Sequence, residues 1–67
     1  MYPYWWAEVV REALDRDITV ITGEEKVILG FPLGSGPFFL SFPSLGKAAL
    51  FLARVGGMYP RRRDARA

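Results

Sequence analysis

The side chains that could do chemistry in this chain are carboxylates, arginines and serines, because the sequence has no histidine and no cysteine. Zinc sites of the usual kind and Ser-His-Asp or Cys-His hydrolases are therefore excluded by residue type. Glu24 and Glu25 are adjacent in a short connection, where we expect them to be solvated. Asp15 and Asp17 lack the ligand series of an EF-hand calcium loop. We therefore expect a non-enzymatic protein with no metal and no cofactor.

The longest uncharged segment, residues 27 to 46, reads VILGFPLGSGPFFLSFPSLG. Its Gly34-Ser35-Gly36 lacks the Lys-Ser/Thr ending of a phosphate-binding P-loop and precedes a predicted strand, whereas phosphate loops lead into a helix N-terminus. Three prolines and several glycines also exclude a continuous membrane-spanning helix, since a spanning helix must satisfy its backbone internally. We expect this segment to form strands, a loop and the start of a helix.

The spacing of apolar and β-branched residues predicts five elements, two helices and three strands, which would position the side chains named above. Residues 3 to 16 carry apolar residues at helical spacing, with Trp6, Val9, Val10, Ala13 and Leu14 in one stripe. Residues 18 to 22 and 26 to 31 are rich in β-branched residues and predict a hairpin, and residues 38 to 42 predict a third strand. Ser44 is a typical N-cap for a second helix over residues 45 to 55, which Gly56-Gly57 ends.

This order predicts an α+β fold, helix, three-stranded antiparallel meander, helix (α-β-β-β-α), with both helices on one sheet face. We expect residues 1–57 to form a single small α+β domain, and residues 58–67 to form a basic, flexible C-terminal tail. The other sheet face would then be open. Strand alternation places either Ile18 and Val20 or Thr19 and Ile21 on it.

An excess of apolar side chains points to protein contacts as the function. Hydrophobic residues make up 51% of the chain and aromatic residues 15%, and a domain of 67 residues has a small core in which to bury them. The expected interface residues are Tyr4, Trp5, Phe39 and Leu50. We therefore expect a small interaction module or regulator that docks on proteins and self-associates as a homodimer. For Trp5, covering the edge of the core is an equal alternative.

Nucleic-acid binding is the alternative function, because basic residues gather in the C-terminal part. They are Lys47, Arg54, Arg61, Arg62, Arg63 and Arg66. The element order over residues 3 to 55 resembles that of double-stranded-RNA-binding domains, which implies an RNA partner. Those domains use a lysine cluster at the start of the last helix, where this chain has Lys47 alone, and a loop between the first two strands, which here carries Glu24 and Glu25. The arginine tail is therefore the expected route to nucleic acid.

A membrane is the least expected partner, since the second predicted helix is too short to cross one. The N-terminus has no basic segment before an apolar run, so no signal peptide is expected. The lack of cysteine fits a cytoplasmic protein. We therefore expect a cytoplasmic location.

Overall fold

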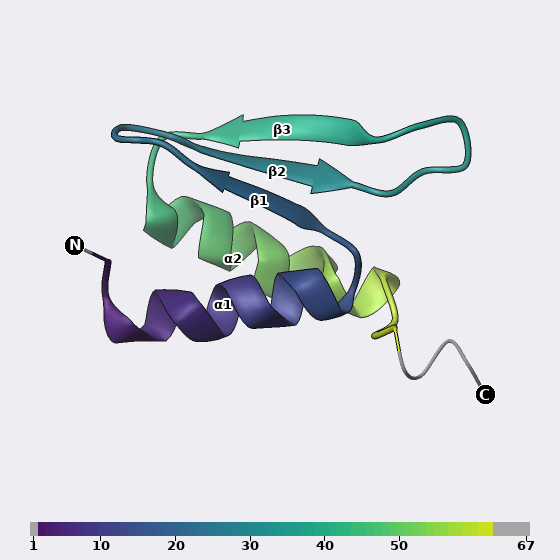
Figure 1. Cartoon of the computed structure of the whole chain (residues 1–67), viewed down its shortest axis with the longest axis horizontal. Coiled ribbons are helices and arrows are strands. Elements are labelled where there is room, and N and C mark those ends of the chain that lie inside the picture. The colour runs from purple at the N-terminus through teal and green to yellow at the C-terminus, as the bar shows by residue number, and fades with distance from the viewer. Residues whose placement is uncertain (1, 63–67) are drawn as a thin grey trace.

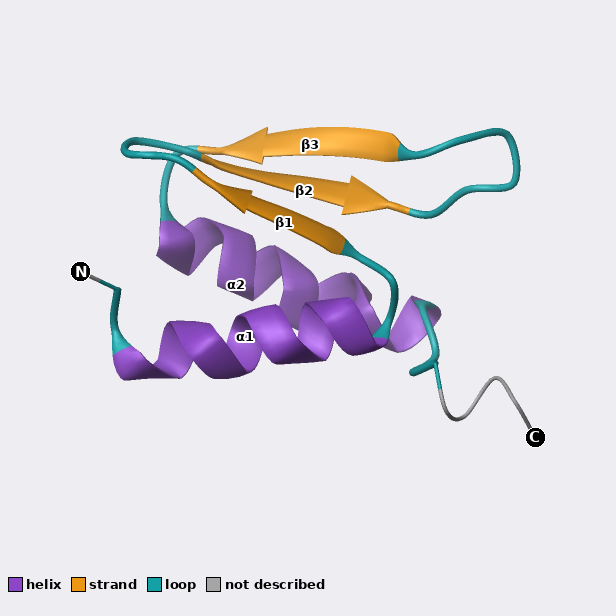
Figure 2. Ribbon diagram, viewed as in Figure 1, coloured by secondary structure: helices purple, strands orange, loops and turns teal. Residues whose placement is uncertain are grey.

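Two layers, a three-stranded sheet and a pair of helices, make up the computed structural model, which describes residues 2 to 62 (Figure 1). The elements in chain order are α1 (Tyr4–Asp15), β1 (Thr19–Thr22), β2 (Val27–Phe31), β3 (Phe38–Phe42) and α2 (Leu45–Val55), followed by a short 3₁₀ turn, Gly56–Met58. Both helices lie on the same side of the sheet (Figure 2). The predicted α-β-β-β-α fold is therefore confirmed. No helix within residues 2 to 62 is long and apolar enough to cross a membrane.

The sharp reversal from α1 into β1 is made at Asp17. Its φ of 61° lies in the left-handed region, where a helix usually ends on glycine. The Asp17 N–H donates to Leu14 O at 3.0 Å, and the Ile18 N–H donates to Ala13 O at 2.9 Å. This pair of bonds is the Schellman ending, and Ile18 and Ala13 supply the apolar contact that accompanies it, since both are buried. The helix end thus delivers β1 directly onto the core.

The sheet is an antiparallel meander in the order β1-β2-β3. Val27, Leu29 and Phe31 of β2 face the helices and are buried, while Ile28 between them faces the other way. Ile21 pairs with Ile28 and therefore shares its outer face. Of the two alternatives left by the sequence, Thr19 and Ile21 are thus the residues on the open face of the sheet.

The core is small and lies between the sheet and the helices. Its buried hydrophobic residues are Trp6, Ala13, Ile18, Val27, Leu29, Phe31 and Ala48. The Phe51 ring of α2 packs against Phe31 and Phe42, with centroids 5.7 and 5.1 Å apart. Leu14 is exposed, so its predicted place in the inward stripe of α1 is wrong. Within residues 2 to 62, no further strand pairs with the outer side of the edge strand β1.

The start of the expected C-terminal tail lies against the domain. Tyr59 packs on Phe31, with ring centroids 5.6 Å apart. Arg61 bonds to Glu12, and Arg62 bonds to Asp17. Tyr59, Arg61 and Arg62, which the sequence assigned to the tail, therefore contact the domain. Arg63 and Arg66, which were also assigned to the tail, lie outside the described residues.

We predict that Leu29→Ala and Ile28→Ala differ sharply in their effect on stability, although the two residues are adjacent. Leu29 is fully buried, and Leu→Ala at such sites costs about 2–5 kcal/mol, which is comparable to the whole stability of a domain this small. Ile28 lies on the open face, and its truncation is expected to cost about 1 kcal/mol or less. Urea unfolding followed by tryptophan fluorescence measures both. Equal losses would contradict the assignment of inner and outer faces.

Candidate functional site

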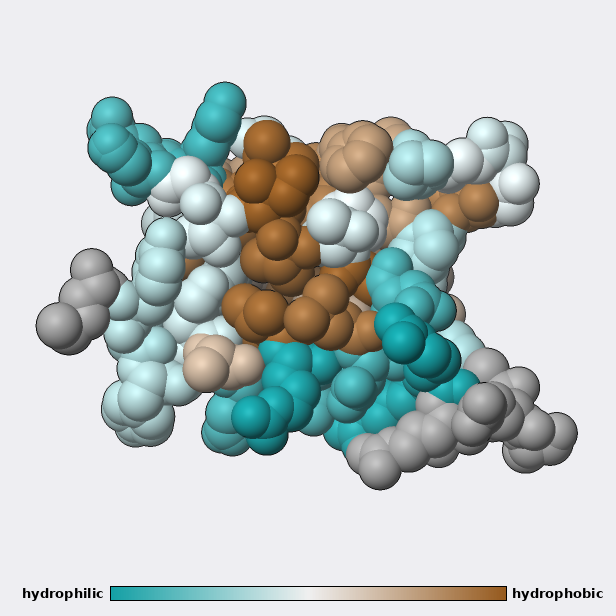
Figure 3. Space-filling model, in the orientation of Figure 1, coloured by the Kyte–Doolittle hydropathy of each residue, from teal (hydrophilic) through white to brown (hydrophobic). Residues whose placement is uncertain are grey.

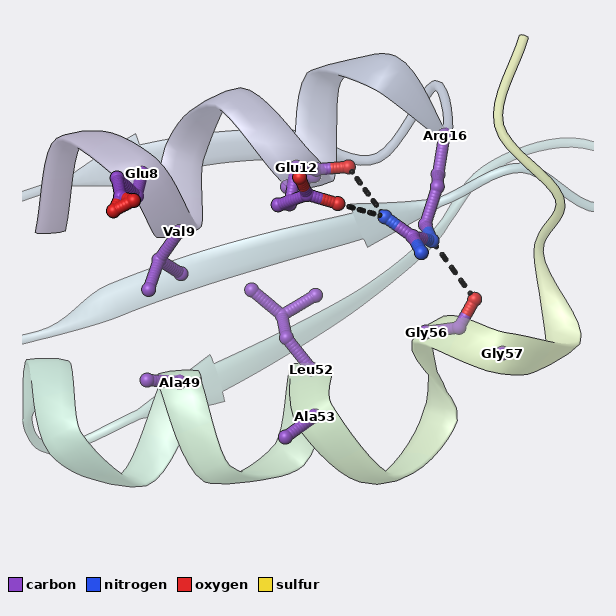
Figure 4. A pocket seen from close by; sticks show the side chains of 10 residues that line it. Glu8, Val9, Glu12, Arg16, Ala49, Leu52, Ala53, Gly56 and Gly57 are labelled. Carbon is purple, nitrogen blue, oxygen red and sulfur yellow. Dashed lines mark hydrogen bonds and ion pairs between the residues drawn. The ribbon is translucent and has the colours of Figure 1, made fainter. Parts of the chain in front are cut away.

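A groove of about 300 Å³ runs between α1 and α2 on the helix layer (Figure 4). Its apolar wall comes from Val9, Ala13, Ala49, Leu52 and Ala53. The groove exists because alanines line much of it and leave space between the helices. Its ionisable side chains are Glu8, Glu12 and Arg16 alone.

At one end of the groove Glu12 and Arg16 join the two helices and the C-terminal segment. The Arg16 Nη1 donates to Glu12 Oε1 at 2.7 Å, and its Nε donates to the carbonyl oxygen of Gly56 at 3.0 Å. The Arg61 Nη2 donates to the same Glu12 oxygen at 2.8 Å. The hydrogen bonds from Arg16 and then Arg61 lower the pKa of Glu12 below its ordinary value. Glu12 is thus a structural anion and poorly suited to donate a proton at neutral pH.

The outer face of the sheet is a second surface that no described element covers. Strands β1, β2 and β3 contain no charged residue. Ile21 and Phe39 are 51% and 54% exposed on this face. Ile28 pairs with Ile21 on one side and with Ser41 on the other, and Phe39 pairs with Gly30. Antiparallel sheets that face water usually carry polar residues on the wet side. This face is therefore more apolar than solvent contact requires.

The Phe39 ring lies close against Gly30 on this face. A Cβ at Gly30 would lie 2.7 Å from one carbon of the Phe39 ring and 3.0 Å from another. Gly30 and Phe39 are also register partners on neighbouring strands. A glycine inside a strand often marks such a close approach. The ring thus occupies the space that a side chain at position 30 would fill.

Strand β3 is an open edge of the sheet and is unusually aromatic. Its sequence is FFLSF, and Phe38 at its start is 51% exposed although its register partner Phe31 is buried. Exposed edge strands normally carry charges, a bulge or a covering element that prevents pairing with another chain. Strand β3 carries no charge and no bulge, and no described element pairs with its outer side. This edge is the strongest candidate for a binding site.

A second apolar area lies over β1 and the adjacent side of α1 (Figure 3). The exposed apolar residues of these elements include Leu14 and Ile21, with Val10 and Val20 half-buried. Hydrophilic side chains border this area along the lower side of the view. Sequence periodicity missed it, because the pattern assigned Leu14 to the core, although Val10 does pack partly against the core as predicted.

The four predicted interface residues do not form one surface. Tyr4 and Trp5 are 89% and 38% exposed at the start of α1, and Leu50 is exposed on α2. Phe39 lies on the opposite side of the sheet from both helices. Trp5 packs edge-on against the buried Trp6, with centroids 6.1 Å apart, so it also borders the core. Of the four, Phe39 alone belongs to the sheet surface described above.

The basic residues proposed for nucleic-acid binding also lie in two separate places, on α2 and in the C-terminal segment. Lys47 and Arg54 are exposed on α2, seven positions apart and so on one side of the helix. Arg61 and Arg62 are paired with Glu12 and Asp17. Two of the expected phosphate-binding charges are thus already neutralised by partners within the chain, while nucleic-acid binding itself stays a prediction.

No protein-family model, curated protein or solved structure matches this chain. The likeness to double-stranded-RNA-binding domains therefore remains one of element order.

We predict that Glu12 titrates below the ordinary glutamate value of 4.5. Its charged form is favoured in the folded state, so its contribution to stability is present above the ordinary value and is lost as the pH falls through the lowered pKa. A carboxyl-carbon NMR titration measures the midpoint. Arg16→Gln and Arg61→Gln should each move the midpoint upward. If Arg61→Gln leaves it unchanged, the contact between Arg61 and α1 does not persist in solution.

We also predict that Gly30→Ala moves the Phe39 ring off the sheet, because the new methyl group would overlap the ring carbons. The ring-current shifts on Thr19, whose Cβ also lies beside this position, should then shrink in the proton NMR spectrum. Gly34→Ala is the control, since a Cβ there meets nothing within 4 Å. Unchanged Thr19 shifts in Gly30→Ala would show that the ring does not rest on Gly30.

Proposed function

We propose that this chain is a small non-enzymatic docking module that works through protein contacts and associates with itself. The observation that carries the proposal is the aromatic, uncharged strand β3 at an open edge of the sheet. More than half of Phe38 and of Phe39 is exposed there, one at the rim of the inner face and one on the outer face. Aromatic side chains bury a large rigid area at low entropic cost, and they dominate binding hot spots.

A second copy of the chain is the partner that the composition favours. The chain buries few large side chains, and a small domain can gain stability by covering apolar surface on an identical chain. Its formal net charge is only +2, so long-range repulsion between two copies is weak.

The cytoplasmic location expected from the sequence stays a prediction.

The test is the oligomeric state of the full chain as a function of concentration, measured by sedimentation velocity. We predict reversible self-association and its loss in Phe39→Asp, which places a carboxylate on the exposed aromatic strand. Leu50→Asp is the matched control, because Leu50 is also more than half exposed but lies on α2. Circular dichroism should show both variants folded.

A chain that remains monomeric up to millimolar concentration would overturn the proposal of self-association. Loss of association in Leu50→Asp together with retention in Phe39→Asp would instead move the docking surface to the helix layer.

A further inference from the structure

The backbone groups that β3 presents outward can be assigned from the register of the sheet. The Gly23 N–H donates to Lys26 O, which fixes the hydrogen-bonded positions of the β1–β2 hairpin. In an antiparallel pair the hydrogen-bonded and non-hydrogen-bonded positions alternate. Ile28 and Gly30 therefore bond toward β1, and Val27, Leu29 and Phe31 bond toward Phe42, Leu40 and Phe38 of β3. The N–H and C=O groups of Phe39 and Ser41 are left pointing away from the sheet.

These outward groups are complementary to those of a second, antiparallel β3. When Phe39 lies opposite Ser41 of the second copy, both residues exchange N–H···O bonds, and the two-fold symmetry repeats the pair. Pro37 and Pro43 occupy the next outward positions and have no N–H to donate. Shifting the register by one pair in either direction would place a proline opposite a bonding residue. In a shifted register the C=O of Phe39 or of Ser41 would face that proline and lack a donor, so one register alone satisfies both the N–H and the C=O groups of these two residues in both strands.

The side chains agree with this register. Leu40 would lie opposite Leu40 of the second copy, and Phe38 opposite Phe42 of the second copy, all on the inner face. These are non-hydrogen-bonded positions, where cross-strand side chains approach most closely. Phe38, half exposed in the single chain, would thereby gain an aromatic neighbour. On the outer face, Phe39 would lie beside Ser41 of the second copy, with no charge on either strand.

The helix layer permits this pairing at β3 and obstructs it at β1. Helices pack about 8–10 Å apart, which is close to two strand spacings of about 4.8 Å. Because α2 contacts both β2 and β3, it lies beneath the gap between them. At this helix spacing α1, which contacts β1, would lie toward the outer side of β1. Pairing through β3 would set the two α2 helices about two strand spacings apart. Pairing through β1 would place the two α1 helices in the same space.

We propose that two copies of this chain associate through β3, as an antiparallel edge-to-edge pair centred on Leu40, to form one continuous six-stranded sheet. This inference rests on the proposed function, whose self-association it explains. It also specifies that the contact is made by backbone hydrogen bonds of Phe39 and Ser41, in addition to the aromatic side chains.

The test removes one outward N–H from each of the two edges in turn. Proline is tolerated in an edge strand where its nitrogen faces solvent, so Ser41→Pro and Thr22→Pro should both leave the monomer folded. Ser41→Pro removes two symmetry-related intermolecular bonds and should weaken self-association at least about tenfold. Thr22→Pro on β1 is the matched control and should leave it unchanged. Sedimentation velocity measures the association, and circular dichroism measures the folding.

A cysteine cross-link tests the register without relying on proline. The chain has no cysteine, so Leu40→Cys provides a single thiol. At a non-hydrogen-bonded antiparallel position the two Cα atoms lie about 4.5 Å apart, within the range that a disulfide spans. Under a mild added oxidant, Leu40→Cys should form a covalent dimer much faster than Ile21→Cys on β1. Gel electrophoresis without reductant measures both.

The possible outcomes separate this inference from the proposed function. Self-association that survives Ser41→Pro, or that is lost equally in Thr22→Pro, would overturn the β3 pairing and leave the docking module standing. Cross-linking that is faster through Ile21→Cys would also overturn it. A wild-type chain that never self-associates would overturn both.

Discussion

The mismatch between helix width and strand spacing governs most of this structure. Two packed helices span about four strand spacings, but the sheet beneath them has only three strands. α2 contacts β2 and β3, and α1 contacts β1. Leu14 of α1 is exposed, and apolar side chains lie at the surface over β1 and α1. The two edges of this small sheet therefore differ in the helix that packs against them.

Arg16 compensates for the small core by joining segments that are far apart in the chain. It lies at the C-cap of α1, and its guanidinium bonds to Glu12 in the preceding turn and to Gly56 beyond α2. Arg61 reaches the same carboxylate, and Tyr59 covers Phe31. An exposed ion pair contributes little by itself. Here Arg16 lies at the Schellman turn that ends α1, and Arg61 follows Tyr59, which packs on the aromatic cluster. These few residues therefore orient both helices and the segment after α2.

Local signals in the sequence were sufficient for the elements but not for the contacts between them. Ser44 caps α2 through its hydroxyl, which accepts from the Lys47 N–H, as its position predicted. The β-branched segments formed the hairpin for the same local reason. By contrast, Arg61 and Glu12 are separated by 49 positions, and no periodicity links them. The burial of Leu14 was predicted wrongly because helical periodicity identifies an apolar side of α1 but not how many strands will cover it.

An uncharged, unprotected edge strand such as β3 is also a route to aggregation, so something must limit which chains can pair with it. In this chain the prolines on both sides of β3 and the helix layer limit its pairing, whereas charges within the strand do not. Pro37 and Pro43 restrict pairing to a short strand in one register, and α2 restricts it to a partner whose own helix lies at the matching distance. A second β3 meets both conditions, and after it pairs neither copy has another free β3 edge. A closed two-fold contact thus uses the exposed edge without propagating.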